Sequence, residues 1–408
     1  MVFKLPTPEN LSTSICICRL NPTFAAIICT AMTLIDFIPE QPLLFWLLVA
    51  FAAITLVQLI YFWLLFGRLA FYKKTFEETD EKPVSVVIIA NNQYRDVNEN
   101  LAAFLEQAHR RYEVVLVVDN SEDGTMELMD EFTKKYPHLR IVELTQSLNW
   151  FSGRKFPLSL GIKSAYSDLI LLTDITCRPA NEKWITEMTA AMQPGREIVL
   201  GYSSWRTKSK INKWLRFTAF YDALLYLSMA LSGIPFKGIG RNLSYTRELF
   251  YRNKGFSAHY TILAGDDELF VNNTATSKNV SVQISPGSRI NQVRPYSFRR
   301  WLASERDRLS IRRYFKAGHR LLIEIYNVSL FLFYGLLTAL LILKAPWVSV
   351  AAVFALRFIS QLILFGLVQK RLHEKNLLLL TPFFEIFLMF IDFFIRLRLL
   401  FSRKRKWQ

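Results

Sequence analysis

The chain has 408 residues, of which 51% are hydrophobic and 33 are phenylalanine, and its formal net charge is +16 at pH 7. Its length exceeds that of one average domain, and this apolar composition favours attachment to a membrane. The basic residues gather beside apolar segments, where they serve topology and contact with anionic lipid, so the charge argues against a nucleic-acid partner.

Residues 42–67 are predicted to form a transmembrane helix. From Pro42 to Phe66 the sequence has no charged residue, and Gln58 is the one strongly polar side chain. At helical rise this run is long enough to cross a hydrocarbon core of about 30 Å. We expect the preceding segment, residues 1–41, to lie on the outer face. Its apolar stretch from Ala25 to Ile38 is too short to span comfortably and lacks the basic start of a signal peptide.

Residues 80–316 form the predicted soluble domain, in which strand patterns alternate with helix patterns. Such alternation predicts an α/β fold with a mostly parallel sheet and helices on both faces. Apolar runs indicate strands at residues 84–90, 114–118, 141–144 and 169–172, and the runs between them indicate helices at residues 97–108, 126–135 and 156–165.

Two of the predicted strands end in a carboxylate. Val114–Val118 leads into Asp119, and Leu169–Leu172 is followed by Thr173 and Asp174. The carboxyl ends of strands in an open α/β sheet are where ligands bind, and a pair of carboxylates suits a ribose hydroxyl and a metal ion on a diphosphate. Asp119 and Asp123 could instead cap the next helix; we interpret Asp119 as a ligand and Asp123 as the cap.

Five motifs follow one another along the soluble domain. The first is a strand with a polar end (Val84–Asn92), and the second is a strand that ends in an acidic loop (Val114–Thr125). A basic segment before a helix (Gly153–Ile162), a glycine-containing loop (Gly240–Tyr245) and an acidic turn (Gly265–Leu269) follow. Their order and spacing resemble membrane-anchored bacterial members of the family 2 glycosyltransferases, which have a nucleotide-diphospho-sugar transferase (GT-A) fold. The resemblance covers roughly residues 84 to 301.

This resemblance implies an inverting glycosyltransferase that moves a sugar from a nucleotide-diphosphate donor to a lipid-linked or membrane-delivered acceptor in cell-surface glycan synthesis. It implies that Asp267 is the catalytic base and that Asp266 orients the acceptor; a solvated acidic turn is the alternative. Arg300 is expected to steady the diphosphate and Trp301 to stack on a sugar. The full set of expected substrate-binding residues is Asn91, Asp119, Lys155, Asp174, Arg241, Asn242, Arg300 and Trp301.

Two positions depart from the family pattern. Where the family usually has Asp-x-Asp, this chain has Asp174 and Thr176, so the expected ligands of Mg²⁺ or Mn²⁺ are one carboxylate and one hydroxyl. Ser297 occupies the glutamine position of the QxxRW motif of processive members, which argues against a polymerising synthase. These departures motivate an alternative, in which the protein is an inactive relative that serves as a membrane scaffold or sugar-nucleotide sensor.

Residues 321–369 are predicted to form a transmembrane helical hairpin. Ile325–Leu343 and Ala345–Val368 are apolar runs, and the turn at Lys344-Ala345-Pro346 is too short for any other connection. Near the middle of the second run stands Arg357, whose guanidinium needs a partner at bilayer depth. The predicted partner is Glu324 or Glu385; the alternative is the phosphate of a lipid-linked acceptor.

Residues 376–408 are predicted to form an interfacial or packed helix with a basic tail. The apolar stretch Leu377–Ile395 contains Pro382, Glu385 and Asp392, and spanning would place two carboxylates near hydrocarbon. If this stretch does not cross, the positive-inside rule puts every basic cluster and the catalytic domain in the cytoplasm, at the inner membrane of a bacterium.

Overall fold

The computed structural model describes residues 42–77, 82–145, 153–262 and 264–401. The predictions for residues 1–41 and for the basic tail at residues 402–408 lie outside the described residues. The chain divides into two compact units. The smaller contains Tyr326–Ser360 with the chain up to Leu59, and the larger contains Ile60–Ile325 and Gln361–Gln408.

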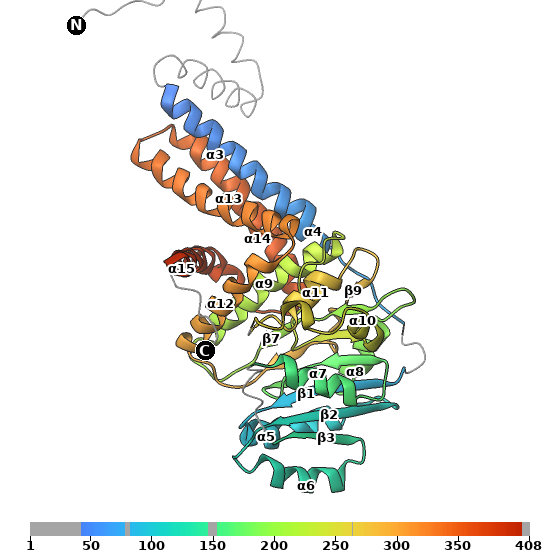
Figure 1. The fold of residues 1–408 in the computed structure, drawn as a ribbon. Helices are drawn as coiled ribbons and strands as arrows, with labels where there is room; N and C mark the ends of the chain where they lie inside the picture. Colours follow the sequence, from blue (N-terminus) through green and yellow to red (C-terminus); the bar gives the residue numbers. More distant parts are fainter. Residues whose placement is uncertain (1–41, 78–81, 146–152, 263, 402–408) are drawn as a thin grey trace, which may run out of the picture. The chain divides into compact units, whose positions relative to one another are not determined.

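The smaller unit is built from parts of three apolar helices. These are α3 (Pro42–Ile60), α13 (Ala317–Ile342) and α14 (Trp347–Arg371) (Figure 1). Leu48 and Phe51 of α3 are buried in one cluster with Phe333 of α13 and Val350 of α14. The rings of Phe51 and Phe333 stack with their centroids 5.1 Å apart. Large apolar side chains such as Trp46 remain exposed, as helices that face lipid require.

Arg357 is buried in the smaller unit, with only 1% of its surface exposed. Its Nε donates a hydrogen bond of 2.7 Å to Oε1 of Gln58, and the guanidinium lies 4.8 Å from the centre of the Phe333 ring. Gln58 is therefore a partner that the sequence did not predict. Of the two predicted partners, Glu324 forms an ion pair with Arg396, and pairing with Glu385 stays a prediction.

Replacing Arg357 with leucine is expected to lower the yield of monodisperse protein in detergent at least about fivefold, because Gln58 would be left buried without its donor. Arg357→Gln, which can still donate a hydrogen bond, should lose less. Size-exclusion chromatography measures the yield. The control is Thr338→Leu, a polar-to-apolar change at an exposed position of α13. Normal yield with impaired sugar transfer would instead assign Arg357 to the acceptor phosphate.

The larger unit contains a seven-stranded sheet in the order β3-β2-β1-β4-β8-β6-β9. Strands β3, β2, β1 and β4 run parallel to one another, whereas β8 is antiparallel to both β4 and β6. The predicted α/β fold with a mostly parallel sheet is confirmed. The strands are β1 (Val84–Ala90), β2 (Tyr112–Asp119), β3 (Leu139–Leu144), β4 (Leu169–Leu172), β6 (Ile198–Leu200), β8 (Leu243–Thr246) and β9 (Val280–Val282).

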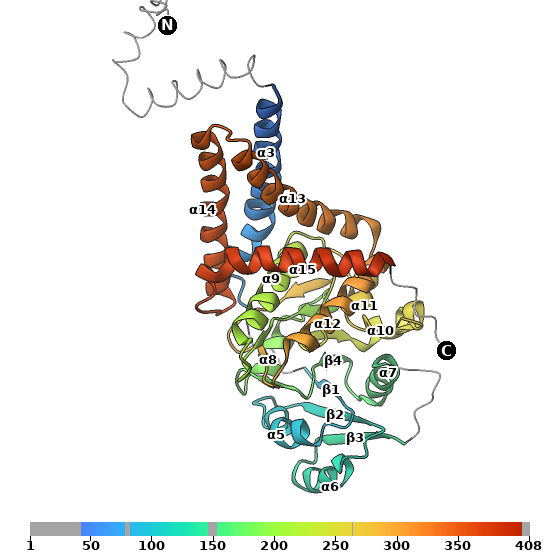
Figure 2. The same ribbon diagram turned by 90° about the vertical axis from the view of Figure 1, so that its left-hand side faces the viewer.

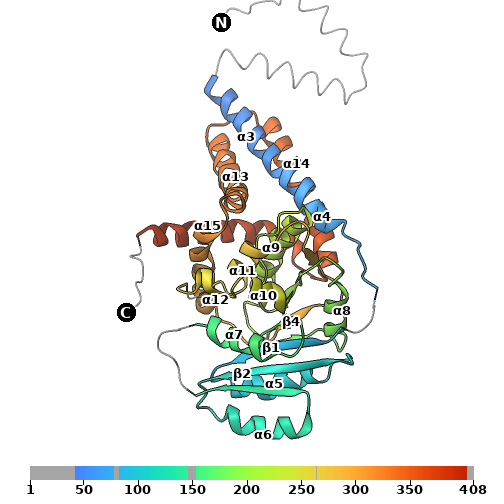
Figure 3. The same cartoon turned by 45° about the vertical axis from the view of Figure 1, so that its right-hand side comes forward.

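Helices cover both faces of this sheet, as Figure 3 shows for α5 and α7. On one face Val86 and Ile88 of β1 belong to a core cluster with Leu101 of α5. On the other face α7 comes so close that a Cβ on Gly161 would lie 2.6 Å from Cγ1 of Val87, so only glycine fits there. The helices of this part are α5 (Tyr94–Leu105), α6 (Thr125–Lys135), α7 (Lys155–Ser164) and α8 (Trp184–Ala190).

A second sheet and a group of helices complete the larger unit. The sheet has three strands in the order β5-β10-β7, with bounds Cys177–Pro179, Ile290–Gln292 and Ser203–Trp205. The helices are α4 (Gly67–Ala70), α9 (Asn212–Leu231), α10 (Arg247–Arg252), α11 (Glu268–Thr274), α12 (Phe298–Ile311) and α15 (Thr381–Phe401), with a π-helical turn η1 (Tyr61–Phe66) and 3-10 turns η2 (Ser257–His259), η3 (Arg312–Tyr314) and η4 (Leu378–Leu380).

Helix α15 packs along α9 and α12 (Figure 2). The ring of Trp214 in α9 lies 5.3 Å from that of Phe384 and 5.1 Å from that of Phe387, and Phe298 of α12 stacks on Phe387. This packing against α9 and α12 was not predicted, and the two predicted arrangements, a helix in the membrane interface or one packed against the hairpin, stay predictions. By length and composition, four helices among the described residues could cross a membrane: Pro42–Ala70, Ala317–Ile342, Trp347–Arg371 and Leu378–Phe401.

The buried carboxylate of Glu374 ties the segment after α14 to strand β7 and helix α9. Arg216 of α9 donates to it at 2.6 Å, the Tyr202 hydroxyl donates at 2.9 Å, and Ser204 of β7 donates as well. Removing one partner from such a buried ion pair is strongly destabilising. The cluster thus fixes β7 (Ser203–Trp205), two of whose side chains line the cavity described next.

Candidate functional site

Three of the predicted ligands lie together at the carboxyl edge of the central sheet. Asn91 follows β1, Asp119 ends β2 and Asp174 follows β4, and β1 is the strand between β2 and β4. Nδ2 of Asn91 donates to the backbone oxygen of Asp119 at 2.7 Å. Burial raises the pKa of Asp119, and a hydrogen bond from Asn91 opposes that change. The parallel strands therefore gather these side chains as expected.

Asp123 caps two helices. Its Oδ2 accepts from the backbone nitrogen of Tyr94 at the start of α5, and its Oδ1 accepts from the hydroxyl of Thr125 at the start of α6. Burial would raise the pKa of Asp123, but these hydrogen bonds lower it overall. Its carboxylate is thus committed to the backbone, which agrees with the predicted capping role and leaves Asp119 to face a ligand.

Asp174 is held by three donors. Its Oδ1 accepts from the backbone nitrogen of Thr176 at 3.0 Å and from the Thr176 hydroxyl at 2.6 Å, and its Oδ2 accepts from Nη1 of Arg154 at 2.6 Å. Burial would raise the pKa of Asp174, but the Arg154 guanidinium and the Thr176 hydrogen bonds lower it to about 2. The carboxylate is therefore ionised throughout the neutral range.

The predicted metal ligands do not form a metal-binding set in this arrangement. The Thr176 hydroxyl donates to Asp174, and a guanidinium already lies against the other oxygen of Asp174. Within the described ranges, no cluster of three or more His, Cys, Asp and Glu side chains is placed to hold a metal ion. Mg²⁺ and Mn²⁺ prefer several oxygen ligands, so the donors offered by Asp174 and Thr176 do not fit either ion.

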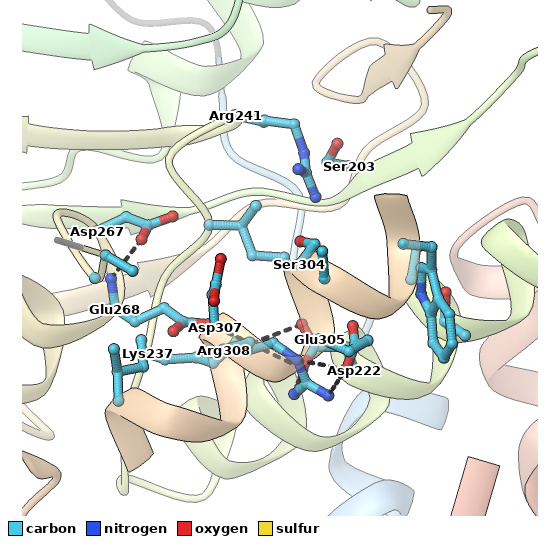
Figure 4. A pocket seen from close by; sticks show the side chains of 18 of the residues that line it. Ser203, Asp222, Lys237, Arg241, Asp267, Glu268, Ser304, Glu305, Asp307 and Arg308 are labelled. Carbon is cyan, nitrogen blue, oxygen red and sulfur yellow. Dashed lines mark hydrogen bonds and ion pairs between the residues drawn. The ribbon is translucent and has the colours of Figure 1, made fainter. Parts of the chain in front are cut away.

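A cavity of about 610 Å³ lies beside this edge. The acidic turn and Lys237 form part of its wall, and Arg241 and Ser203 approach from across the cavity, as Figure 4 shows. Arg154, Arg300 and Trp301 also line it. The cavity therefore brings together predicted residues from three separate motifs, and it contains charged groups of both signs.

The acidic turn is mostly buried, which contradicts the alternative of a solvated turn. Asp267 precedes α11 and is fixed by the backbone: Oδ1 accepts from the nitrogen of Glu268 at 2.8 Å and Oδ2 from that of Gly240 at 2.5 Å. A Cβ on Gly240 would lie 3.1 Å from that Oδ2, so the glycine permits the approach. Burial and the charge of Asp267 raise the pKa of Asp266, whereas Arg154, 3.9 Å away, lowers it.

A buried network of charges borders the cavity, and sequence reasoning missed it. The Lys237 ammonium bridges Asp222 at 2.7 Å and Glu268 at 3.0 Å, and Arg308 pairs with Asp222 at 3.3 Å and with Glu305 (Figure 4). Burial raises the pKa of Glu268, against the effect of Lys237. The members come from α9, a loop, α11 and α12, so no local pattern in the sequence pointed to them.

Lys155 was predicted to bind substrate, and the structure gives it a different role. Its ammonium donates to the backbone oxygens of His259 at 2.7 Å, Ala264 at 3.1 Å and Ile262. Burial lowers its pKa, with Asp266 and Asp267 opposing that change. All three hydrogen-bond donors of the ammonium are thus used to hold the loop before α11.

Asn242 was also predicted to bind substrate, but its side chain is fully buried and fully bonded. Nδ2 donates at 2.8 Å to the backbone oxygens of both Tyr202 and Ser288, and Oδ1 accepts from the indole nitrogen of Trp184 at 3.0 Å. No donor is left for a ligand. The residue instead joins three segments of the larger unit.

The motif at the start of α12 has one exposed and one buried member. Arg300 is exposed and lines the cavity, whereas Trp301 is only 3% exposed and packs against Trp214 at 5.0 Å and Phe298 at 5.3 Å. The predicted stacking of Trp301 on a sugar lacks an open ring face. Ser297, which replaces the family's glutamine, caps the helix by accepting from the backbone nitrogen of Arg300 at 3.3 Å.

Arg241 was predicted to bind substrate, and its placement agrees with such a role. Its guanidinium lies 5.9 Å from the centre of the Trp205 ring and points toward the cavity (Figure 4). Its Nε is buried and has no hydrogen-bond partner among the described residues. Arg241 and Arg300 therefore offer donors to an anion in the cavity.

Curated relatives match only part of this chain. The chain is 31% identical over 106 residues to the probable glycosyltransferase YdaM of Bacillus subtilis, which is 25% of each protein. It is 28% identical over 144 residues to the dolichol-phosphate mannosyltransferase of Pyrococcus furiosus, which is 35% of this chain and 38% of that protein. The chain thus spans between a quarter and two fifths of these relatives.

A solved structure supports the fold over a longer range. The mannosyltransferase PcManGT from Pyrobaculum calidifontis, determined in complex with GDP-Man and Mn²⁺, aligns with a TM-score of 0.54 at 19% sequence identity. The alignment covers 83% of this chain and 98% of that one. At this identity the likeness concerns the fold alone, and it agrees with the predicted GT-A fold.

The family assignment rests on nearly the whole chain. The sequence model that describes glycosyl transferase family 21, a GT-A-type family, matches residues 29–407. The resemblance to GT-A glycosyltransferases, first seen in five motifs, is thereby confirmed. The chain belongs to glycosyl transferase family 21.

Proposed function

We propose that this protein is an inverting glycosyltransferase that moves a sugar from a nucleotide-diphosphate donor to a lipid-linked or membrane-delivered acceptor. The observation that carries the proposal is the cavity in which the backbone-anchored Asp267 lies with Arg154 and Arg300. The base and ribose of the donor bind at Asn91 and Asp119, and its diphosphate binds on the cationic side of the cavity. A neighbour in fold was solved with a nucleotide sugar, which supports this class of donor.

The reaction needs a base on one side of the anomeric carbon and a stabilised leaving group on the other. Asp267 accepts the proton of the acceptor hydroxyl as that oxygen forms its bond to the anomeric carbon. The bond from that carbon to the diphosphate breaks on the opposite face, so the configuration inverts. Arg300 donates to the diphosphate as negative charge develops on it.

The apolar surface near the cavity supports an acceptor that arrives from the membrane. Phe298 and Leu302 of α12 and Phe387 of α15 are at least 36% exposed, and Phe298 packs on Trp301 at the cavity wall. An acceptor with a lipid tail can bury that tail on these side chains while its hydroxyl enters the cavity. The basic segments beside the apolar helices favour a cytoplasmic domain at the bacterial inner membrane, in cell-surface glycan synthesis.

The second candidate is a catalytically inactive scaffold or sensor, which the Thr176 and Ser297 departures motivated. Both departures have local explanations, because Thr176 orients Asp174 and Ser297 caps α12. A scaffold would have no need for an ion-pair network at the wall of a cavity, where each buried charge costs free energy unless it is paired. We therefore favour the enzyme.

A donor panel tests the proposed function. Purified full-length protein in bacterial lipid is incubated with nucleotide sugars based on UDP, GDP and dTDP, and the released nucleoside diphosphate is measured. One donor should give release that depends on the lipid fraction, and Asp267→Asn should reduce this release about a hundredfold. Nuclear magnetic resonance of the product should show the anomeric configuration opposite to that of the donor. Retained configuration contradicts the mechanism, and binding without turnover for any donor favours the sensor.

A further inference from the structure

Arg154 lies between the two acidic parts of the site. Its Nη1 donates to Oδ2 of Asp174 at 2.6 Å, and its Nε lies 3.9 Å from Oδ2 of Asp266. These acids come from the end of β4 and from the turn before α11. The Arg154 side chain is 47% exposed and lines the cavity. The guanidinium is therefore anchored on its acidic side and open on its other side.

This position is the one that a metal ion would need. A small divalent ion would have to approach an oxygen of Asp174 to about 2.1 Å. Oδ2 of Asp174 already accepts from the guanidinium, and Oδ1 accepts from both the backbone and the hydroxyl of Thr176. An ion at Oδ2 would also face the positive charge of Arg154 directly. The ion and Arg154 thus compete for the same oxygen.

Arg154 supplies a positive charge where the family's metal ion would supply one. In an Asp-x-Asp site, two carboxylates offset the two charges of a divalent ion. Here Thr176 replaces one carboxylate, and the single charge of Asp174 is offset by the single charge of Arg154. A guanidinium has five N–H donors in one plane, which suits two oxygens of a phosphate at once, and the contact to Asp174 uses one of them.

We propose that Arg154 is the cation that holds the donor's diphosphate, so that nucleotide binding needs no divalent ion. The inference rests on the glycosyltransferase function proposed above and deepens it. The anchors to Asp174 and Asp266 orient the guanidinium, and its remaining donors face the cavity. Thr176, which replaces the family's second aspartate, and Arg154, which pairs with Asp174, are then two parts of one change from a metal ion to an arginine.

Isothermal titration of UDP, GDP and dTDP into the full-length protein in detergent tests the proposal. One sample contains EDTA, and the other contains Mn²⁺ after removal of the chelator. For wild-type protein, the dissociation constants of the preferred nucleotide in EDTA and in Mn²⁺ should agree within about threefold. Arg154→Ala should bind that nucleotide at least about tenfold more weakly than wild type in both conditions. The control is Arg252→Ala: Arg252 has a side-chain exposure of 51% and pairs with Glu197 at 2.6 Å, and it does not line the cavity.

A second variant separates a missing charge from a damaged fold. Arg154→Ala leaves the mostly buried Asp174 without its cation, so thermal unfolding is measured for each variant. Arg154→Ala combined with Thr176→Asp supplies the usual pair of carboxylates without the arginine. This double variant should bind nucleotide in Mn²⁺ at least about tenfold more tightly than in EDTA. Equal binding of the double variant in both conditions overturns the proposed exchange of arginine for metal.

The wild-type result also distinguishes the two proposals. If EDTA abolishes nucleotide binding and Mn²⁺ restores it, the role of Arg154 is wrong and the glycosyltransferase function stands. If wild-type protein binds none of the three nucleotides in either condition, the donor site itself is wrong and both proposals fall.

Discussion

Asp267→Asn is expected to lower turnover by about a hundredfold or more while it leaves nucleotide binding nearly unchanged. An amide cannot accept the proton of the acceptor hydroxyl, but it has almost the same size as the carboxylate. Both oxygens of Asp267 accept from backbone nitrogens, so the carboxylate is held in one orientation before substrate arrives. Single-turnover rates and titration with the nucleoside diphosphate measure the two quantities separately.

Asp266→Asn is the matched comparison for this variant. Asp266 is the neighbouring carboxylate on the same turn, and it faces Arg154 rather than the backbone of α11. If Asp267 is the base, Asp266→Asn should lower the turnover rate less than Asp267→Asn does. In Asp267→Asn, the new side-chain NH₂ group cannot accept a hydrogen bond from the backbone N–H that it faces, which can destabilise the fold. The melting temperatures of both variants are therefore measured. Near-normal turnover in Asp267→Asn would transfer the base role to Asp266 or Glu268.

The sequence predicted the first half of the fold well because its signals are local. Strands β1 and β4 coincide with the apolar runs at residues 84–90 and 169–172, since buried parallel strands are continuous apolar segments. Strand β6 (Ile198–Leu200) has three residues and pairs with β8 from a distant part of the chain. Such short strands have no pattern of their own, and their place in the sheet depends on the assembled core.

The site was predicted where a backbone element determines it. Asp119 and Asp174 follow parallel strands, so their shared edge follows from topology. Of the two basic residues before α7, Lys155 was the predicted substrate-binding residue, but Arg154 is the one that lines the cavity. Successive residues of a helix point about 100° apart, so the sequence does not say which of two adjacent cations faces the ligand. Here Lys155 faces the loop before α11, and Arg154 faces the cavity.

Long-range contacts explain the remaining errors. Asn242 fits a family motif, yet its partners Trp184, Tyr202 and Ser288 lie at least 40 positions away. Those contacts consume every donor and acceptor of its side chain apart from one lone pair of the oxygen. Gln58 likewise carries no sign in the sequence that it meets Arg357, which is 299 positions away. A motif identifies residue types, but burial decides which of them remain available to a substrate.

Arg300→Ala is expected to lower turnover about a hundredfold, the scale seen when a donor to developing negative charge is removed. Arg300 lies at the start of α12, is exposed, and lines the cavity. Its backbone nitrogen, not its side chain, takes part in the cap with Ser297, so truncation of the side chain leaves the helix cap intact. The change should therefore appear in the rate of the chemical step and not in the melting temperature.

Arg299→Ala is the matched control, because Arg299 is the adjacent exposed arginine on the same helix and is not among the residues that line the cavity. It removes the same charge near the site, so any loss from general electrostatic attraction of the donor should be equal in both variants. If only Arg300→Ala lowers turnover, Arg300 contacts the diphosphate as that group leaves. If Arg300→Ala raises the KM for the donor but leaves kcat unchanged, Arg300 binds substrate and transition state equally. Stabilisation of the leaving group would then have to come from Arg154, whose anchored guanidinium binds the diphosphate before the reaction begins.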